Sequence, residues 1–209
     1  MHIVGPSFGG WVVQCFVRRY PDRVATLILS DTGFPRKERA LAGNISLPLL
    51  SMLPSRMMHA ILKRELVSSL PALPEQERAF WIAYFTEVLT RNTKADILCL
   101  WKCAIDLHQH YRFTPNDLVL RPGRVLILDS DDDPAIAASV RTVLKALYPS
   151  AQTYIFHKAG HTPFLTRREE YLSVVRHFLK EKQLDHREVG SKEVLKVSFS
   201  PRQKKEVGE

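Results

Sequence analysis

The chain has 209 residues, of which 45% are hydrophobic and 25% charged, and its formal net charge is +8 at pH 7. This size suffices for one globular domain with its own core, whereas no apolar run reaches the roughly 20 residues that a membrane-spanning helix needs. The positive charge is spread along the chain without a basic, aromatic-interleaved stripe, so we expect no nucleic-acid partner and no membrane span.

The first predicted element is a buried strand that runs into a glycine-flanked serine. Ile3 and Val4 end the strand, and Gly5-Pro-Ser-Phe-Gly9 follows. A Gly-x-Ser-x-Gly run between a strand and a helix is typical of a nucleophile elbow, which makes Ser7 the candidate nucleophile. The backbone N–H of Phe8, at the helix start, is the candidate oxyanion donor. We expect both glycines to leave room for the strained turn and for close packing; the alternative is an ordinary Gly-Ser turn.

A helix and a second strand are predicted next, which makes residues 1–34 the first core segment. Apolar residues recur at helical spacing from Trp11 to Tyr20, and Pro21 ends the helix. The run from Arg23 to Ser30 is apolar without alternation, as expected of a parallel strand that is covered on both faces.

Residues 35–120 differ in character, because they read as helices without a convincing strand. We expect breaks in these helices at Pro48, Pro54, Pro71, Pro74 and Pro115. We expect two apolar stripes to be mostly core: Leu49, Leu50, Met52, Leu53, Met57, Met58, Ile61 and Leu62, and then Phe80, Trp81, Tyr84, Phe85 and Val88.

Cysteine and histidine residues in this segment give no metal site. Cys99 and Cys103 are one helical turn apart, but we find no further zinc ligands at a suitable spacing. His108 and His110 would face different ways on a helix. We therefore predict no metal and no cofactor. Three cysteines without a signal-peptide pattern predict a cytoplasmic location.

The second core segment, residues 121–183, is predicted to contain two more strands and two helices. An apolar strand begins at Arg124 and ends in a carboxylate cluster, and a helix follows from Ala135 to Leu147. A strand from Ala151 to Lys158 leads into Ala-Gly-His-Thr-Pro-Phe-Leu, and the last helix runs from Arg167 to Lys182. Residues 184–209 carry charges of both signs among isolated aliphatics, which predicts a disordered tail.

These segments together resemble the α/β-hydrolase superfamily, from about residue 2 to residue 180. In that family the nucleophile, the acid and the histidine follow one another in this order. The acid lies in a turn after the penultimate strand, and the histidine lies in a Gly-His turn before the last helix. The resemblance implies that Asp133 is the acid and His161 the base. His161 would take the proton from Ser7, and Asp133 would hold its tautomer and stabilise the imidazolium.

Each of these assignments has an alternative. Asp131, Asp132 and Asp133 all fit solvated loop carboxylates, and we expect at least two of them to be so. His161 also fits an ordinary loop histidine. The spacing of the aspartates is similar to that of a calcium loop, but Pro134 stands where an EF-hand needs Gly, so we reject that interpretation.

The resemblance also implies how the parts are arranged. Residues 35–120 would be a helical cap that shapes a pocket for a small-molecule substrate with an apolar portion. Because several strands and a loop with the second oxyanion donor precede the elbow in this family, we expect an α/β-hydrolase fold lacking its N-terminal strands. About four mostly parallel strands would remain, flanked by helices, with the elbow strand at an edge. We expect a second copy or another partner to cover that edge.

The activity implied is hydrolysis of an ester, thioester, amide or related bond by Ser7, His161 and Asp133 through an acyl-enzyme. We expect the chain to be a truncated hydrolase; the alternative is a natural short form without activity. One alternative is a non-catalytic protein-binding module such as the maspardin group, although His161 argues against that group. Another is C–C bond hydrolysis or cofactor-free perhydrolysis by the same triad. Epoxide hydrolases and haloalkane dehalogenases are disfavoured, because they use Asp where this chain has Ser7.

Overall fold

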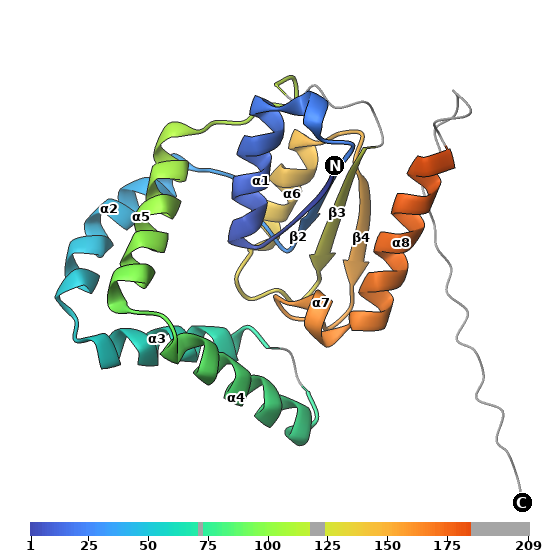
Figure 1. Cartoon of the computed structure of the whole chain (residues 1–209). Helices are drawn as coiled ribbons and strands as arrows, with labels where there is room; N and C mark the ends of the chain where they lie inside the picture. The colour runs from blue at the N-terminus through green and yellow to red at the C-terminus, as the bar shows by residue number, and fades with distance from the viewer. Residues whose placement is uncertain (71–72, 118–123, 185–209) are drawn as a thin grey trace, which may run out of the picture.

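The computed structural model describes residues 1–70, 73–117 and 124–184 (Figure 1). The predicted break at Pro71 and the predicted tail, apart from its first residue, lie outside these ranges. Four parallel strands form one sheet in the order in which they occur in the chain: β1 (His2–Pro6), β2 (Thr26–Ser30), β3 (Val125–Ser130) and β4 (Gln152–Phe156). The elbow strand β1 lies at an edge of this sheet, as predicted.

Helices cover both faces of the sheet. Helices α1 (Phe8–Arg19) and α6 (Ala138–Leu147) lie on one face, whereas α8 (Arg168–Leu184) lies on the other (Figure 1). A one-turn 3-10 helix (Pro21–Arg23) precedes β2, and a short helix α7 (Pro163–Thr166) precedes α8. These short elements explain why the second strand and the last helix begin later than predicted from the sequence.

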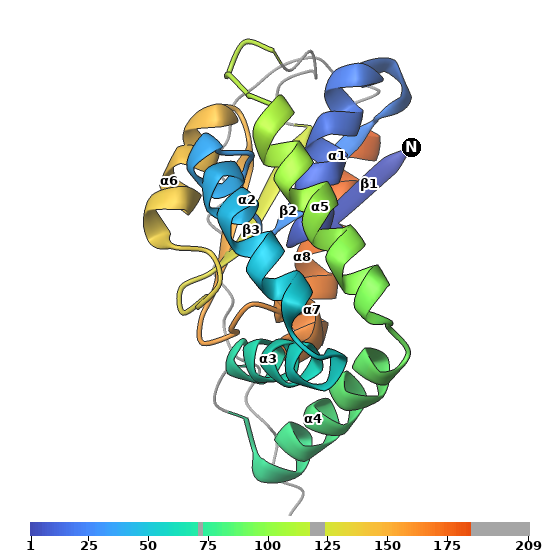
Figure 2. The same cartoon turned by 90° about the vertical axis from the view of Figure 1, so that its left-hand side faces the viewer.

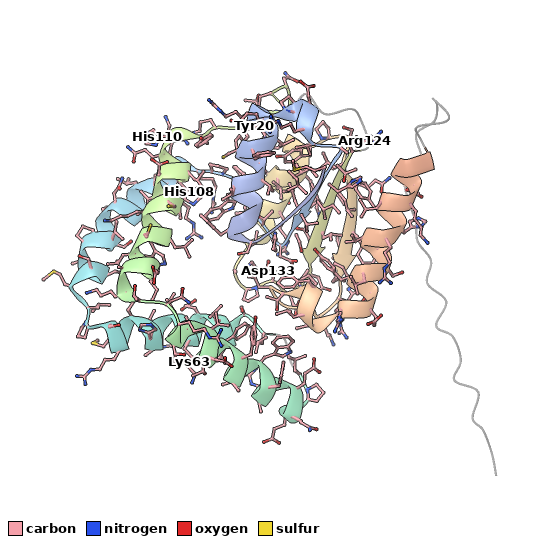
Figure 3. The ribbon with its side chains drawn as sticks, in the orientation of Figure 1. Tyr20, Lys63, His108, His110, Arg124 and Asp133 are labelled. Carbon is pink, nitrogen blue, oxygen red and sulfur yellow. The ribbon has the colours of Figure 1, made fainter. Side chains whose placement is uncertain are left out.

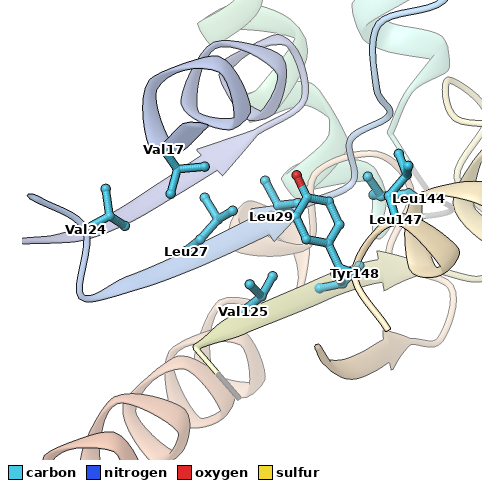
Figure 4. Close-up of a cluster of buried hydrophobic side chains, with 9 residues drawn as sticks. Val17, Val24, Leu27, Leu29, Val125, Leu144, Leu147 and Tyr148 are labelled. Atoms are coloured by element: carbon cyan, nitrogen blue, oxygen red, sulfur yellow. The ribbon is translucent and has the colours of Figure 1, made fainter. Parts of the chain in front are cut away.

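The two central strands are buried at every position, which is why their sequences are largely apolar and do not alternate with exposed polar residues. On one face, Leu27 and Leu29 pack with Val17 of α1 and Leu144 of α6 (Figure 4). On the other face, alternate side chains of the same strands pack against Phe178 of α8. The carboxyl ends of all four parallel strands therefore meet at one edge of a sheet whose two central strands are buried between helices.

The segment between β2 and β3 folds as four helices to one side of the sheet: α2 (Lys37–Met52), α3 (Ser55–Ser68), α4 (Glu75–Thr90) and α5 (Lys94–His110) (Figures 1 and 2). Helix α2 packs along α5, and α3 packs against α4. We call these four helices the insertion. Pro54 and Pro74 directly precede α3 and α4, and Pro115 follows α5, as predicted.

The predicted break at Pro48 is wrong, because this proline lies inside α2. A proline within a helix removes the hydrogen bond to the carbonyl four residues earlier, here that of Asn44. Both residues are exposed, so water can solvate the freed carbonyl oxygen. The helix therefore continues through the proline.

The prediction that the apolar stripes of the insertion are mostly core is also wrong. Of their members only Met58 and Phe85 are buried, whereas Met52 is 80% and Phe80 is 60% exposed. The reason is geometrical, since each helix of this thin layer packs mainly on one neighbour. Although these surfaces are apolar, no helix within the described residues is long and apolar enough to cross a membrane.

A buried polar network joins α1 to the segments around it. The Gln14 side chain donates to the Gly33 carbonyl at 2.8 Å, and the Tyr148 hydroxyl donates to Gln14 Oε1 at 2.8 Å. Arg18 donates to the Tyr148 oxygen at 2.9 Å and to Asp117 at 2.7 Å. Burial raises the pKa of Tyr148 to about 12, which keeps its hydroxyl protonated. The network fixes the helix that follows Ser7.

Replacing Tyr148 with Phe tests this network. We expect Tyr148→Phe to lower the free energy of unfolding by about 1–3 kcal/mol, because Gln14 Oε1 loses its donor inside the protein. Tyr111 is 41% exposed, so Tyr111→Phe is the control and should stay within about 0.5 kcal/mol of wild type. Urea denaturation measures both values, and equal effects in the two variants would contradict the prediction.

Candidate active site

Ser7 occupies the turn between β1 and α1 in a conformation that few non-glycine residues adopt, with φ 47° and ψ −122°. Three hydrogen bonds hold this turn. The Ser7 N–H donates to the Ser30 carbonyl at 2.9 Å, and the Ser7 carbonyl accepts from Gly10 N–H at 3.0 Å and from the Thr32 hydroxyl at 2.6 Å. Such a conformation costs on the order of 1–3 kcal/mol and persists only where the surroundings enforce it.

The glycines around Ser7 have unequal roles. A Cβ added at Gly5 would lie 2.8 Å from Gly10 Cα and 2.9 Å from the Gly9 oxygen, and one added at Gly10 would lie 2.6 Å from Thr32 Cβ. A Cβ at Gly9 would lie 3.5 Å from its nearest neighbour, Pro6 Cδ, which is an ordinary contact. The expectation that Gly9 provides room is therefore wrong, because Gly5 and Gly10 allow the close packing.

The side chains of Ser7, His161 and Asp133 form one hydrogen-bonded chain. His161 Nε2 is 2.8 Å from Ser7 Oγ, and His161 Nδ1 is 3.0 Å from each carboxylate oxygen of Asp133. The Asp133 side chain is fully buried in the loop after β3 (Figure 3), and that of His161 is 12% exposed. An ionised carboxylate only accepts hydrogen bonds, so Nδ1 carries the proton and Nε2 accepts from the serine hydroxyl.

Asp133 is also fixed by the backbone of the next turn. Its Oδ1 accepts from the N–H of Ala135 at 2.7 Å and from that of Ile136 at 3.1 Å. A carboxylate with several donors remains oriented while the imidazole changes its protonation state.

The two preceding aspartates join the acid loop to the histidine loop. Both are exposed, in line with the expectation that two of the three carboxylates are solvated. Asp131 nevertheless accepts from Lys158 N–H at 2.9 Å, and Asp132 accepts from Gly160 N–H at 2.8 Å. The hydrogen bond from Lys158 holds the pKa of Asp131 below its usual value. These bonds place His161 beside Asp133, a role that the sequence pattern did not predict.

Phe8, the candidate oxyanion residue, is the first residue of α1. Its N–H makes no hydrogen bond within the described residues, so it is available at the helix N-terminus. The Phe8 ring packs edge-on against the Trp11 ring, with 5.6 Å between the ring centroids. The Trp11 ring also packs on the ring of His108 of α5, with a centroid separation of 4.4 Å. His108 is buried, whereas His110 is exposed, so the two face different ways as predicted (Figure 3). Burial lowers the pKa of His108 to about 4, which leaves it neutral.

The insertion touches the histidine loop through a backbone hydrogen bond. The carbonyl of Ser69, at the end of α3, accepts from the N–H of His161 at 3.0 Å. Ser69 and Leu70 are buried there. A contact between residues so far apart in the sequence has no sequence signature.

Sequence reasoning also missed Asp31, which directly follows β2. Asp31 is only 1% exposed. Burial raises the pKa of its carboxyl to about 7, and the charge of Asp133 adds to the rise. The available signal was a carboxylate directly after a largely apolar parallel strand, the position in which a parallel sheet places functional groups.

The cysteines and the other ionisable groups do not form a second centre in the described part of the chain. No group of three or more His, Cys, Asp or Glu side chains there is arranged to hold a metal ion. Cys99 and Cys103 are exposed, and burial raises the pKa of the Cys15 thiol to about 11. A thiol with so high a pKa is not an activated nucleophile.

The sequence model of the alpha/beta hydrolase fold family matches residues 1–167. No curated protein matches the chain. An esterase from Thermogutta terrifontis is similar in structure, with 21% identity and a TM-score of 0.65, over 87% of this chain and 65% of the esterase.

Two further solved structures are similar to a comparable degree. MenH from S. aureus is 19% identical with a TM-score of 0.61, over 86% of this chain and 68% of MenH. The enol-lactonase from Burkholderia xenovorans LB400 is 16% identical with a TM-score of 0.64, over 86% of this chain and 65% of the lactonase. At these identities the likeness shows the fold alone, and the chain spans about two thirds of the length of these proteins.

Alanine substitutions test the unequal roles of the two glycines of the elbow. Gly5→Ala should destabilise the protein by about 1–3 kcal/mol, because backbone atoms cannot move away from the added methyl group. Gly9→Ala should raise the free energy of unfolding by no more than about 1 kcal/mol, since alanine has a higher helix propensity than glycine. Thermal and urea unfolding measure both variants. A Gly9→Ala variant that loses as much stability as Gly5→Ala would contradict the interpretation.

Proposed function

The chain belongs to the α/β-hydrolase fold family, and from this premise we propose that it is a serine hydrolase. It cleaves an ester, thioester, amide or related bond through an acyl-enzyme. The observation that carries the proposal is the hydrogen-bonded chain from Ser7 Oγ through His161 to the buried carboxylate of Asp133. That the same fold occurs in an esterase and in an enol-lactonase supports ester cleavage as the reaction class.

In the first step Ser7 Oγ attacks the carbonyl carbon of the substrate while His161 Nε2 takes the hydroxyl proton. The resulting imidazolium keeps its Nδ1–H on Asp133, whose negative charge stabilises it. The negative charge that develops on the carbonyl oxygen is stabilised by the Phe8 N–H and by the N-terminus of α1.

In the second step the imidazolium gives its proton to the leaving group as the bond between that group and the carbonyl carbon breaks. The acyl-enzyme on Ser7 remains. A water molecule, deprotonated by His161, then attacks the acyl carbon. The imidazolium returns this proton to Ser7 Oγ as the bond between the acyl carbon and Oγ breaks, and the acid is released. Every one of these proton transfers uses His161 Nε2, so the orientation that Asp133 imposes on the imidazole serves each of them.

We further propose that the insertion acts as the cap of this site and that the substrate has an apolar portion. The support is the hydrogen bond from His161 N–H to the Ser69 carbonyl, which places the end of α3 directly against the base. The insertion also offers exposed apolar side chains such as Phe80 and Tyr84. A cap of this composition suits an acyl chain better than a charged group.

A fluorophosphonate probe tests the proposed nucleophile. We expect the folded chain to be phosphonylated on Ser7, as located by peptide mass spectrometry, and Ser7→Ala to abolish labelling. His161→Gln should slow it by roughly a thousandfold or more, because the serine loses its base. Ser51→Ala, at an exposed serine of the insertion, is the control and should label like wild type.

Two outcomes of this experiment would overturn the proposal. One is a chain with intact circular dichroism and no labelling, which would favour a non-catalytic binding protein. The other is equal labelling in wild type and Ser7→Ala.

A series of p-nitrophenyl esters tests the apolar portion. Burial of a CH₂ group contributes about 0.8 kcal/mol, so kcat/KM should rise by up to about fourfold per added CH₂ from acetate to hexanoate. The Ser7→Ala variant gives the background rate at each length. A flat or falling series would contradict an apolar acyl pocket.

A further inference from the structure

Asp31 lies where three parts of the site meet. It directly follows β2, the strand between β1, which leads to Ser7, and β3, which leads to Asp133. Its N–H donates to the Leu128 carbonyl at 2.8 Å, and its φ is 43°. A positive φ is uncommon outside glycine, and Asp31 is only 1% exposed.

The Asp31 carboxyl is buried without a salt bridge within the described residues. Its Oδ2 accepts from the Ser30 hydroxyl at 3.1 Å, whereas its Oδ1 is buried without a hydrogen-bond partner there. Four neighbouring groups shift the pKa of Asp31: Ser30 of β2, Ser130 of β3, and Asp133 and His161 of the two loops. Asp31 in turn helps to raise the pKa of Tyr171 of α8.

These neighbours act in opposite directions on the protonation of Asp31. Burial raises its pKa to about 7, and the negative charge of Asp133 adds to the rise. The hydroxyls of Ser130 and Ser30 and the positive charge of His161 favour the ionised form. The attraction between His161 and ionised Asp31 is mutual, since each charge stabilises the other.

We propose that Asp31 is a positioning residue of this site, a second buried carboxyl that acts through His161 and, once ionised, adds its negative charge to that of Asp133 in stabilising the imidazolium. This inference rests on the proposed serine hydrolase function. It gives the base two carboxyls: Asp133, which orients the imidazole through a hydrogen bond, and Asp31, which contributes charge alone and only where the pH permits.

The same arrangement sets the pH dependence of stability. The pKa of Asp31 is raised above the value of about 3.9 for an unfolded chain. The neutral carboxyl therefore favours the fold below pH 4, and this contribution is lost as the pH rises through about 7. Asp31→Asn should accordingly gain stability relative to wild type as the pH increases over this range.

The first experiment compares the rate of fluorophosphonate labelling in wild type and Asp31→Asn between about pH 5 and pH 9, two units on either side of the pKa of about 7. The ratio of the wild-type labelling rate to that of the variant should be near one in acid and should rise in base by up to about tenfold, which corresponds to about 1.4 kcal/mol. Asp129→Asn is the matched control, because this carboxylate is also buried but pairs with Lys145; its ratio should not change with pH.

The second experiment reads the carboxyl itself and needs no activity. In ¹³C NMR the Asp31 carboxyl should titrate near pH 7. Its midpoint should fall by at least about half a unit in Asp133→Asn, because the repulsion between the two carboxylates is removed. Asp129→Asn should leave the midpoint in place.

The outcomes separate the two proposals. If wild type is not labelled while the carboxyls are coupled, the hydrolase function fails, and with it the effect of Asp31 on Ser7 reactivity. If wild type is labelled and the ratio is independent of pH, Asp31 is structural and only this inference fails. An Asp31 carboxyl that titrates in the ordinary range, or that ignores Asp133→Asn, would overturn it in either case.

Discussion

The hydrogen bonds between the Ser7 turn and the end of β2 are the constraint on which the site depends. Ser7 holds a positive φ because Ser30 and Thr32 bind its N–H and its carbonyl oxygen. Ser30, the last residue of β2, and Thr32, in the loop after it, thus fix the Ser7 turn, and the buried Asp31 lies between them in the sequence. Because β1 and β2 are parallel and in register, with Pro6 opposite Ser30, the turn and its support emerge at the same level. The acid and histidine loops, which follow β3 and β4, are aligned there by the same sheet.

Those parts of the fold and of the candidate site that are marked by a short sequence pattern could be predicted from the sequence. The strands, the elbow, Asp133 and His161 were all predicted, because each is marked by a short pattern and because carboxyl ends of parallel strands must meet. Whether Gly9 or Gly10 provides room depends on where Thr32 lies, which no local pattern states. The continuation of α2 through Pro48 likewise depends on exposure to water.

The exposure of the apolar stripes of the insertion and the burial of Asp31 could not be predicted, for a different reason. A stripe such as Phe80, Tyr84 and Val88 has the spacing of a packed helix whether or not a partner covers it, and here none of the described residues buries it. Asp31 looks like one more loop carboxylate in the sequence. Its significance comes from complete burial beside Asp133 and His161, which is a property of the assembled core.

The hydrogen bond between His161 N–H and the Ser69 carbonyl joins the insertion to the loop that carries His161. His161 is held by three partners: Ser7 and Asp133 through its ring, and the end of α3 through its backbone N–H. Moving this end of α3 outward breaks that hydrogen bond to the histidine loop. The position of α3 and the alignment of the His161 imidazole are therefore coupled. A displacement of α3 acts on His161 directly through the peptide group of Ser69.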